Sequence, residues 1–395
     1  MCMGVTRRRF LQRTIQAGTA LAIGCGTARG DGTDTGDTLA CEDALAGGEL
    51  VRILRFDDEN LVRYEERQQQ GWDGLLRADL SALTPYKLFM SNERFFIRTL
   101  APDRLDPDKP WSIRIHGLVE GDMILPMEEL ESLTRSQGSF VLECAGNVGY
   151  GFGLMSAASW DGVLIEDILK MVSPRPDATQ LLISGFDEHS IPSKNSTPGA
   201  SWVFTFDQLA QAGAFLATRM NGESLPPDHG APVRLIVPGW YGCTAIKWVN
   251  ELRLVRDDEP ATAQMREFAS RIHQRGAPRL ARVYSAAAAD QAAMPVRIEQ
   301  WRSGGATRYR IVGILWGGHR ITDRLALRVN PGETYFPIKI CPRMVRNQPW
   351  TLWSHVWDPP APGRYKMRAR IDDRTIPTLR LDQGWYDRVV EISEV

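Results

Sequence analysis

Residues 142–147, Leu-Glu-Cys-Ala-Gly-Asn, place a cysteine where a short apolar run gives way to small residues. Small neighbours let a bulky group reach the sulfur of Cys144, and a thiolate is a suitable ligand for a soft or high-valent metal. A buried structural cysteine is the competing interpretation, because free cysteine is among the most buried residue types. Cys144 is therefore a candidate metal ligand.

A second stretch, residues 220–248, brings His229, Arg234 and Lys247 together among proline and glycine residues. Proline and glycine at 226–227, 230 and 238–239 predict loops. Arginine offers paired donors to a phosphate, and lysine offers a mobile point charge. The set predicts an anion site, whereas each residue alone could be a solvated lysine or a hydrogen-bonded core histidine.

The elements that must position these residues mix helix and strand up to residue 285. Hydrophobic spacing predicts strands at 111–117, 140–142, 180–184 and 233–237, and helices at 127–133, 165–171 and 206–212. From residue 286 onward, strand-like runs alternate with turns, at 309–314, 325–329, 350–356, 365–371 and 388–392. The predicted fold class is α+β, with a mixed α/β domain at 50–285 followed by an immunoglobulin-like β-sandwich at 286–395.

Composition excludes several classes of protein. The 395 residues carry a formal net charge of −1, which gives no basic surface for a nucleic acid. The six cysteines form no CxxC pair, which excludes a zinc ribbon, a thioredoxin-like motif and c-type haem attachment. Disulfide pairing among Cys41, Cys243 and Cys341 stays open.

The N-terminus has the pattern of a twin-arginine export signal, predicted for residues 1–26. Thr6 and three arginines precede a mildly apolar stretch at 15–24, which is shorter than the roughly 20 residues of a membrane span. A short amphipathic helix with a basic start is the alternative. Residues 27–49, rich in Gly, Thr and Asp, predict a flexible linker. We expect a periplasmic protein, and Cys25 could carry a lipid anchor.

Together with Phe-Phe-Ile-Arg at 95–98 and Trp-Asp-Gly-Val at 160–163, the two stretches resemble the molybdopterin domain of the sulfite oxidase family. The C-terminal region resembles that family's dimerisation domain, and the resemblance runs from about residue 80 to the end. It implies that residues 50–285 are the catalytic domain and that Cys144 coordinates molybdenum. The residues implied to bind the molybdopterin cofactor are Phe96, Arg98, Cys144, Asn147, His229, Arg234 and Lys247.

The resemblance further implies transfer of an oxygen atom to or from a small substrate, in the manner of a sulfite dehydrogenase. The sequence has no recognisable haem domain or iron–sulfur motif, so the two electrons would pass to an external carrier such as a cytochrome. Cys144 and Arg98 are implied to be catalytic, and the C-terminal domain is implied to form a homodimer.

The chain departs from the family pattern beside Asn147. Sulfite-oxidising members carry two arginines there, whereas this chain has Val148 and Gly149. The glycine-rich run 149–153 predicts a roomier, less charged entrance, in which Tyr150 or Phe152 stacks on the substrate. Two alternatives follow: a reductase of S- or N-oxides on the same metal–thiolate site, and a cofactor-free binding protein that retains the fold.

Overall fold

The computed structural model describes residues 45–57, 59, 74–106, 108–147, 152–191, 199–320, 322, 324–340 and 349–395. Residues 1–40 and 41–395 are separate compact units, and all that follows concerns the second. The predicted signal, Cys25, residues 27–44 of the linker, Cys41, Tyr150 and Cys341 lie outside the described residues. Among the residues described, no helix has the length and apolar character needed to cross a membrane.

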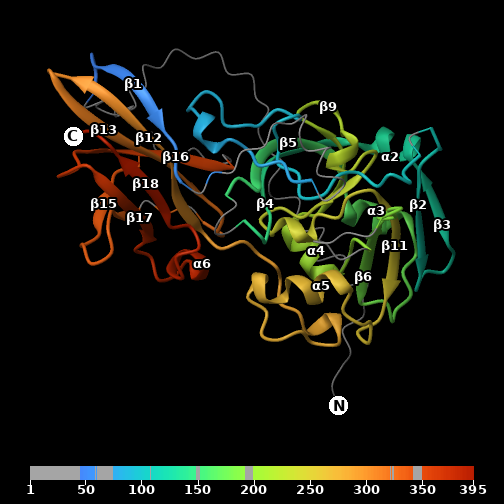
Figure 1. Cartoon of the computed structure of the whole chain (residues 1–395). Helices are drawn as coiled ribbons and strands as arrows, with labels where there is room; N and C mark the ends of the chain where they lie inside the picture. Colours follow the sequence, from blue (N-terminus) through green and yellow to red (C-terminus); the bar gives the residue numbers. More distant parts are fainter. Residues whose placement is uncertain are drawn as a thin grey trace, which may run out of the picture. The chain divides into compact units, whose positions relative to one another are not determined.

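The chain after Trp111 contributes all the strands of a five-stranded sheet, whose order is β3-β2-β11-β6-β7 (Figure 1). Its strands are β2 (Ser112–Gly117), β3 (Met123–Pro126), β6 (Gln180–Gly185), β7 (Ser201–Thr205) and β11 (Val249–Val255). β2 and β11 run parallel, and the other neighbouring pairs are antiparallel. Ile113 and Ile115 of β2 are at most 1% exposed, and the residues between and around them face outward, as in a half-buried strand.

A second, antiparallel sheet has the order β10-β8-β5-β4, with β9 paired to β8. Its strands are β4 (Arg135–Glu143), β5 (Met155–Leu164), β8 (Phe215–Met220), β9 (Glu223–Ser224) and β10 (Arg234–Ile236). β4 ends directly before Cys144, and β10 begins at Arg234. Both candidate stretches are therefore attached to one sheet.

Short helices connect these strands. They are α2 (Met127–Leu133), α3 (Ile165–Met171), α4 (Phe206–Ala212) and α5 (Ala263–Phe268), with 3-10 turns η3 (Leu80–Ala82), η4 (Pro227–His229), η5 (Gly242–Thr244), η6 (Ala269–Ile272) and η7 (Ala281–Val283). Thr205 and Gln208 form a capping box at the start of α4, and Gly213 ends it in the left-handed conformation. The helices predicted at 127–133, 165–171 and 206–212 are confirmed.

Two antiparallel four-stranded sheets contain the C-terminal strands (Figure 1). One has β1 (Glu49–Leu54), β12 (Ala292–Ser303), β13 (Ala306–Trp316) and β16 (Trp350–Trp357), and the other has β14 (Leu325–Arg328), β15 (Phe336–Ile338), β17 (Gly363–Ile371) and β18 (Arg388–Ile392). Their side chains meet, as in the edge-on contact of Trp357 with Tyr365, whose ring centroids are 4.8 Å apart. The edge strand β1 precedes all the strands of the five-stranded sheets in the sequence.

The core joins the two halves of the chain. One hydrophobic cluster contains Leu142, Cys144 and Trp160 together with Ile311 and Trp316 of the C-terminal sheets. The described residues thus form a mixed α/β structure with mostly strands and few helices. The sequence prediction identified about half of the strands: β1, β3, β5, β7, β8, β9, β11, β12 and β15 and the helix α5 have no predicted counterpart. β4 begins at Arg135 rather than near residue 140, and α6 (Leu379–Asp382), also not predicted, is a single turn, too short to leave a periodic pattern.

Gly162 of β5 marks a close approach of two strands. A Cβ atom there would lie 2.8 Å from the carbonyl carbon of Leu216 and 2.9 Å from the Cα of Ala217 in β8. We predict that Gly162→Ala lowers the free energy of unfolding by about 1–3 kcal/mol, because backbone must move. The check is a urea-unfolding midpoint compared with Gly121→Ala, an exposed position where a Cβ meets nothing within 4 Å. Equal midpoints for the two variants would contradict the prediction.

Candidate functional site

Cys144 directly follows the last residue of β4. It lies in a turn, and its sulfur points into the interior of the protein. Its amide donates to the carbonyl of Leu154 (2.8 Å), and the amide of Gly146 donates to its Sγ (3.3 Å). The residue is 5% exposed. Burial raises the pKa of the thiol, and the Gly146 amide and the charges of Arg98, Arg271 and Arg380 act against that rise. Burial outweighs these contributions, so the neutral thiol is favoured until a cation such as a metal ion lies beside the sulfur.

Asn147 fixes the far side of this turn. Its Nδ2 donates to Glu143 Oε1 (3.1 Å), and its Oδ1 accepts from the amide of Leu154 (3.1 Å). The side chain is fully buried. It thus ties the start of the turn to the residue before the following strand.

Arg234 and Lys247 are buried cations whose hydrogen-bond partners are backbone carbonyls. Arg234 donates to the carbonyls of His229 (3.0 Å) and Ala245 (3.4 Å), and Lys247 Nζ donates to those of Thr99 (2.6 Å) and Asp228 (3.0 Å). Burial lowers the pKa of Arg234 to about 9 and that of Lys247 to about 7. Carbonyl dipoles only partly replace water, so both cations favour an anion beside them.

His229 is neutral and fixed in orientation. Its Nε2 lies 2.7 Å from the carbonyl oxygen of Asn92, which can only accept, so Nε2 carries the proton. Burial lowers its pKa to about 3. The ring also meets Phe95 edge-on, with centroids 5.4 Å apart. Nδ1 is consequently an acceptor for a ligand N–H or O–H.

Asn92 was not identified from the sequence, yet it connects the Met-Asn-Gly-Glu run to His229. Its Nδ2 donates to Met220 O (3.2 Å) and Glu223 Oε2 (3.1 Å), and its Oδ1 accepts from Asn221 Nδ2 (2.9 Å). Asn221 has a φ of 54°, a conformation that asparagine tolerates. A single asparagine far from the motif gives no signal in one sequence.

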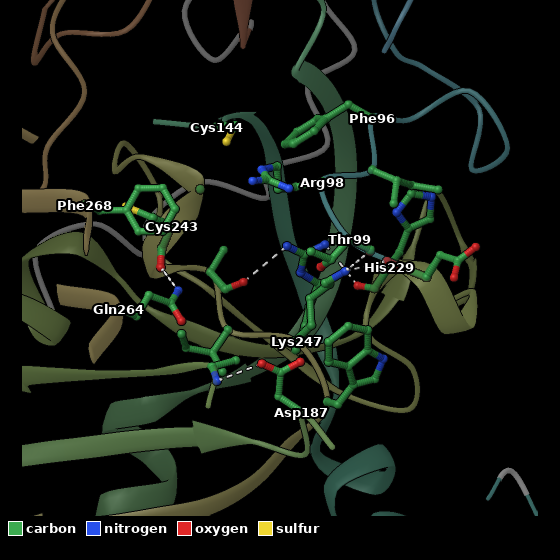
Figure 2. Close-up of a pocket in the computed structure, with 18 of the residues that line it drawn as sticks. Phe96, Arg98, Thr99, Cys144, Asp187, His229, Cys243, Lys247, Gln264 and Phe268 are labelled. Atoms are coloured by element: carbon green, nitrogen blue, oxygen red, sulfur yellow. Dashed lines mark hydrogen bonds between the residues drawn. The ribbon is translucent and has the colours of Figure 1, made fainter. Parts of the chain in front are cut away.

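One pocket contains both candidate stretches (Figure 2). Phe96, Arg98, Cys144, His229, Arg234 and Lys247 all line it. In Figure 2 Arg98 is drawn between Cys144 and Lys247. Gly230, with a φ of 107°, allows the close approach of the second stretch, because a Cβ there would lie 3.0 Å from the Cβ atoms of Arg234 and Lys247. Asn147 stabilises the Cys144 turn through its hydrogen bonds to Glu143 and Leu154 and does not line the pocket. Tyr150 lies outside the described residues.

Two further residues near Cys144 were not assigned to the site from the sequence. Cys243 is a second buried thiol that lines the pocket, and it forms no disulfide with any residue described. Arg271 of η6 lies close to the turn that contains Cys144: a Cβ on Gly146 would be 3.6 Å from Arg271 Nη1 and 3.7 Å from Cys144 Sγ. Its guanidinium lies over the ring of Phe268 at 5.2 Å. Only folding brings η6 to this turn.

A thiol at one wall and buried cations at another fit a metal–pterin cofactor with a phosphate. The buried Nε of Arg234 has no hydrogen-bond partner among the described residues, so a donor remains for a ligand oxygen. Arg234 also lies over the ring of Trp160 at 5.5 Å, which holds the guanidinium plane in place. The residues present thus fit a ligand that combines a soft-metal site with an anionic tail.

The comparisons with known proteins agree with this geometry. The model of the oxidoreductase molybdopterin binding domain matches residues 99–263. Nitrate reductase [NADPH] of Aspergillus niger is 34% identical over 192 residues, which are 44% of this chain and 22% of the relative. Mitochondrial sulfite oxidase of Rattus norvegicus is 29% identical over 192 residues, which are 45% of this chain and 35% of the relative. The matches thus span about a fifth to a third of these longer relatives.

The fold also matches a solved structure along nearly its whole length. The crystal structure of the sulfane dehydrogenase SoxCD from Paracoccus pantotrophus superposes with a TM-score of 0.61, covering 95% of this chain and 98% of that chain. The identity is 18%, so this likeness shows a shared fold. Molybdenum and molybdopterin are the cofactors of the matched domain family, which confirms the predicted cofactors.

The pKa of His229 generates a prediction on acid stability. Between its ordinary value of 6.5 and its folded value of about 3, the unfolded chain binds a proton that the folded chain does not. The free energy of unfolding therefore falls as pH falls through this window, by about 2–3 kcal/mol from this group at pH 4.5. His229→Gln should remove that contribution, so its loss of stability between pH 7 and pH 4.5 is smaller than in the wild type. Urea-unfolding midpoints at the two pH values test this, and parallel losses would refute it.

Proposed function

We propose that this chain, whose residues 99–263 match the oxidoreductase molybdopterin binding domain, is a molybdenum enzyme of the sulfite oxidase family that transfers an oxygen atom to or from a small anionic substrate. The observation that carries the proposal is the single pocket that Cys144 shares with Arg98, Arg234 and Lys247. The favoured reaction is sulfite dehydrogenase-like oxidation.

Cys144 would hold the metal, and the cations would hold the phosphate of the pterin. When bound, the cofactor supplies the redox change of the metal that accompanies oxygen-atom transfer. The chain's own part begins with the Cys144 proton, which must leave before the sulfur can bind a metal. The Gly146 amide donates to the Cys144 sulfur, and Arg234 and Lys247 would hold the phosphate.

Arg98 and Arg271 support an anionic substrate. Val148 and Gly149 supply no positive charge after Asn147. The positive charges of Arg98 and Arg271 both act on the Cys144 sulfur instead. An oxyanion needs such concentrated charge to offset its lost hydration. The proposal therefore retains a sulfur oxyanion such as sulfite as the substrate class.

Reduction of an S- or N-oxide on the same site is the second candidate, and the similarity to fungal nitrate reductase favours it. Two assays separate the candidates: sulfite with a dye acceptor, and nitrate or dimethyl sulfoxide with a reduced dye. Turnover in only the second assay would replace the favoured reaction. Absence of molybdenum after expression in a cofactor-competent host would instead favour the cofactor-free binding protein.

Further proposals concern the setting of the enzyme. Electrons would pass to an external carrier such as a cytochrome. The C-terminal sheets would form an immunoglobulin-like sandwich through which two copies pair, with domain boundaries near residues 50 and 285. The twin-arginine pattern at 6–12 supports export to the periplasm, with Cys25 as a site for a lipid anchor. Size-exclusion chromatography with light scattering and cell fractionation test these proposals.

Cys144→Ser tests the central assignment. A serine hydroxyl ionises far less readily than a thiol and is a harder ligand, so we expect loss of activity with a dye acceptor and a lower molybdenum content. Metal analysis and the assay are run on the same preparation. Cys243→Ser identifies which of the two pocket thiols is the ligand: loss of molybdenum in C243S with retention in C144S would contradict the assignment.

Arg271→Met tests anion recognition. Loss of a charge-assisted contact should raise the KM for sulfite roughly 10- to 100-fold, with molybdenum content unchanged. Arg266→Met is the matched control, because Arg266 is an exposed arginine on the neighbouring helix α5. A KM that is the same in R271M and R266M would show that Arg271 does not contact the substrate.

A further inference from the structure

Glu143, the residue before Cys144, is a buried carboxylate with three hydrogen-bond donors around it. Oε1 accepts from Tyr386 OH (2.7 Å) and Asn147 Nδ2 (3.1 Å), and Oε2 accepts from Trp316 Nε1 (2.8 Å). The residue is 2% exposed. An indole N–H and an amide NH₂ can only donate, so the arrangement suits an ionised carboxylate.

Two of these donors belong to the C-terminal sheets. Trp316 is the last residue of β13, and Tyr386 lies between α6 and β18. Their rings meet edge-on with centroids 5.1 Å apart, and the two side chains are at most 3% exposed. The pair thus forms a rigid wall that presents two donors to Glu143.

Arg380 of α6 holds the residue on the other side of Cys144. It is fully buried, and its Nη2 donates to the carbonyls of Ala145 (3.1 Å) and Arg271. The guanidinium lies over the rings of Tyr241 at 3.8 Å and Trp385 at 4.8 Å. The C-terminal segment therefore contacts both neighbours of the proposed metal ligand.

A charged residue at position 143 requires an explanation beyond packing. Burial of a carboxylate costs free energy that an apolar or amide side chain would avoid, even when hydrogen bonds satisfy the charge. A glutamine could not replace it without loss. If the amide oxygen faced Trp316, the NH₂ group would face the NH₂ group of Asn147, and the reverse orientation would oppose the Trp316 N–H. The three donors thus fix the side chain of Glu143, and with it the backbone from which Cys144 follows.

We propose that Glu143 is a positioning residue: held by hydrogen bonds from Trp316 and Tyr386, it fixes the turn that presents Cys144 to the bound metal. The inference rests on the proposed function, because it takes Cys144 as the ligand of molybdenum. It gives the C-terminal sheets a role in the chemistry of the site.

Glu143→Gln in the full-length holoenzyme is the primary test. We expect a shifted molybdenum midpoint potential, a changed Mo(V) electron paramagnetic resonance spectrum, and activity per bound molybdenum lowered roughly 10- to 100-fold, because Cys144 is presented differently. The matched control is Glu299→Gln. Glu299 is also a buried carboxylate, and it accepts from Trp301 Nε1 (3.1 Å), Arg297 Nε (2.8 Å) and Arg310 Nε (2.7 Å) within the C-terminal sheets. E299Q should lower the melting temperature but leave the potential and the spectrum as in the wild type.

Tyr386→Phe keeps the test decisive if E143Q does not fold. It removes one donor to Glu143 and retains the ring against Trp316, so it should change the Mo(V) spectrum. Tyr309→Phe is its control, because the Tyr309 hydroxyl donates to Glu394 O (2.6 Å) in the same sheets and is expected to leave the spectrum unchanged.

Wild-type potential and spectrum in E143Q, or a wild-type spectrum in Y386F where E143Q does not fold, would overturn this inference and leave the proposed function in place. A C144S protein that keeps the wild-type molybdenum content and spectrum would overturn the proposed function instead, and with it the premise of this inference. The spectrum of each variant thus tells the two failures apart.

Discussion

Positive charge buried against backbone carbonyls is the constraint on which the site depends. Arg234 and Lys247 are enclosed, and burial lowers both pKa values, that of Lys247 to about 7. Such cations reduce the stability of the folded chain until an anion lies beside them. A ligand with a phosphate removes that penalty, so its binding also stabilises the fold. The surrounding structure must hold the cations in place before the ligand arrives.

Hydrogen bonds between distant loops provide that support. Asn92 joins the turn at Asn221 to the ring of His229: its side chain accepts from Asn221, and its backbone carbonyl accepts from His229 Nε2, so one residue fixes both a loop and a neutral acceptor. Trp160 and Trp248 lie against Arg234 and Lys247, respectively. Rings and carbonyls stabilise these cations without neutralising them, which leaves their charge available to a ligand.

The thiol end of the pocket depends on the C-terminal half of the chain. Cys144 lies in a hydrophobic cluster that also contains Trp316, and its two neighbours receive hydrogen bonds from Trp316, Tyr386 and Arg380. Mutations in the C-terminal sheets can therefore change the position of Cys144 through packing and hydrogen bonds, without any substitution in the pocket itself.

The sequence by itself determined the cofactor, about half of the strands and three of the helices. Cys144 and the cations around His229 stand in local motifs, and helices such as 165–171 follow from residue spacing that extends over few residues. Only the tertiary structure decided which charges surround Cys144. Arg271 and Arg380 come from segments more than a hundred residues away, and single-sequence patterns hold no record of such contacts. The absence of arginine at 148 and 149 suggested a less charged site, and the fold brings Arg271 and Arg380 to the turn of Cys144 from elsewhere in the chain.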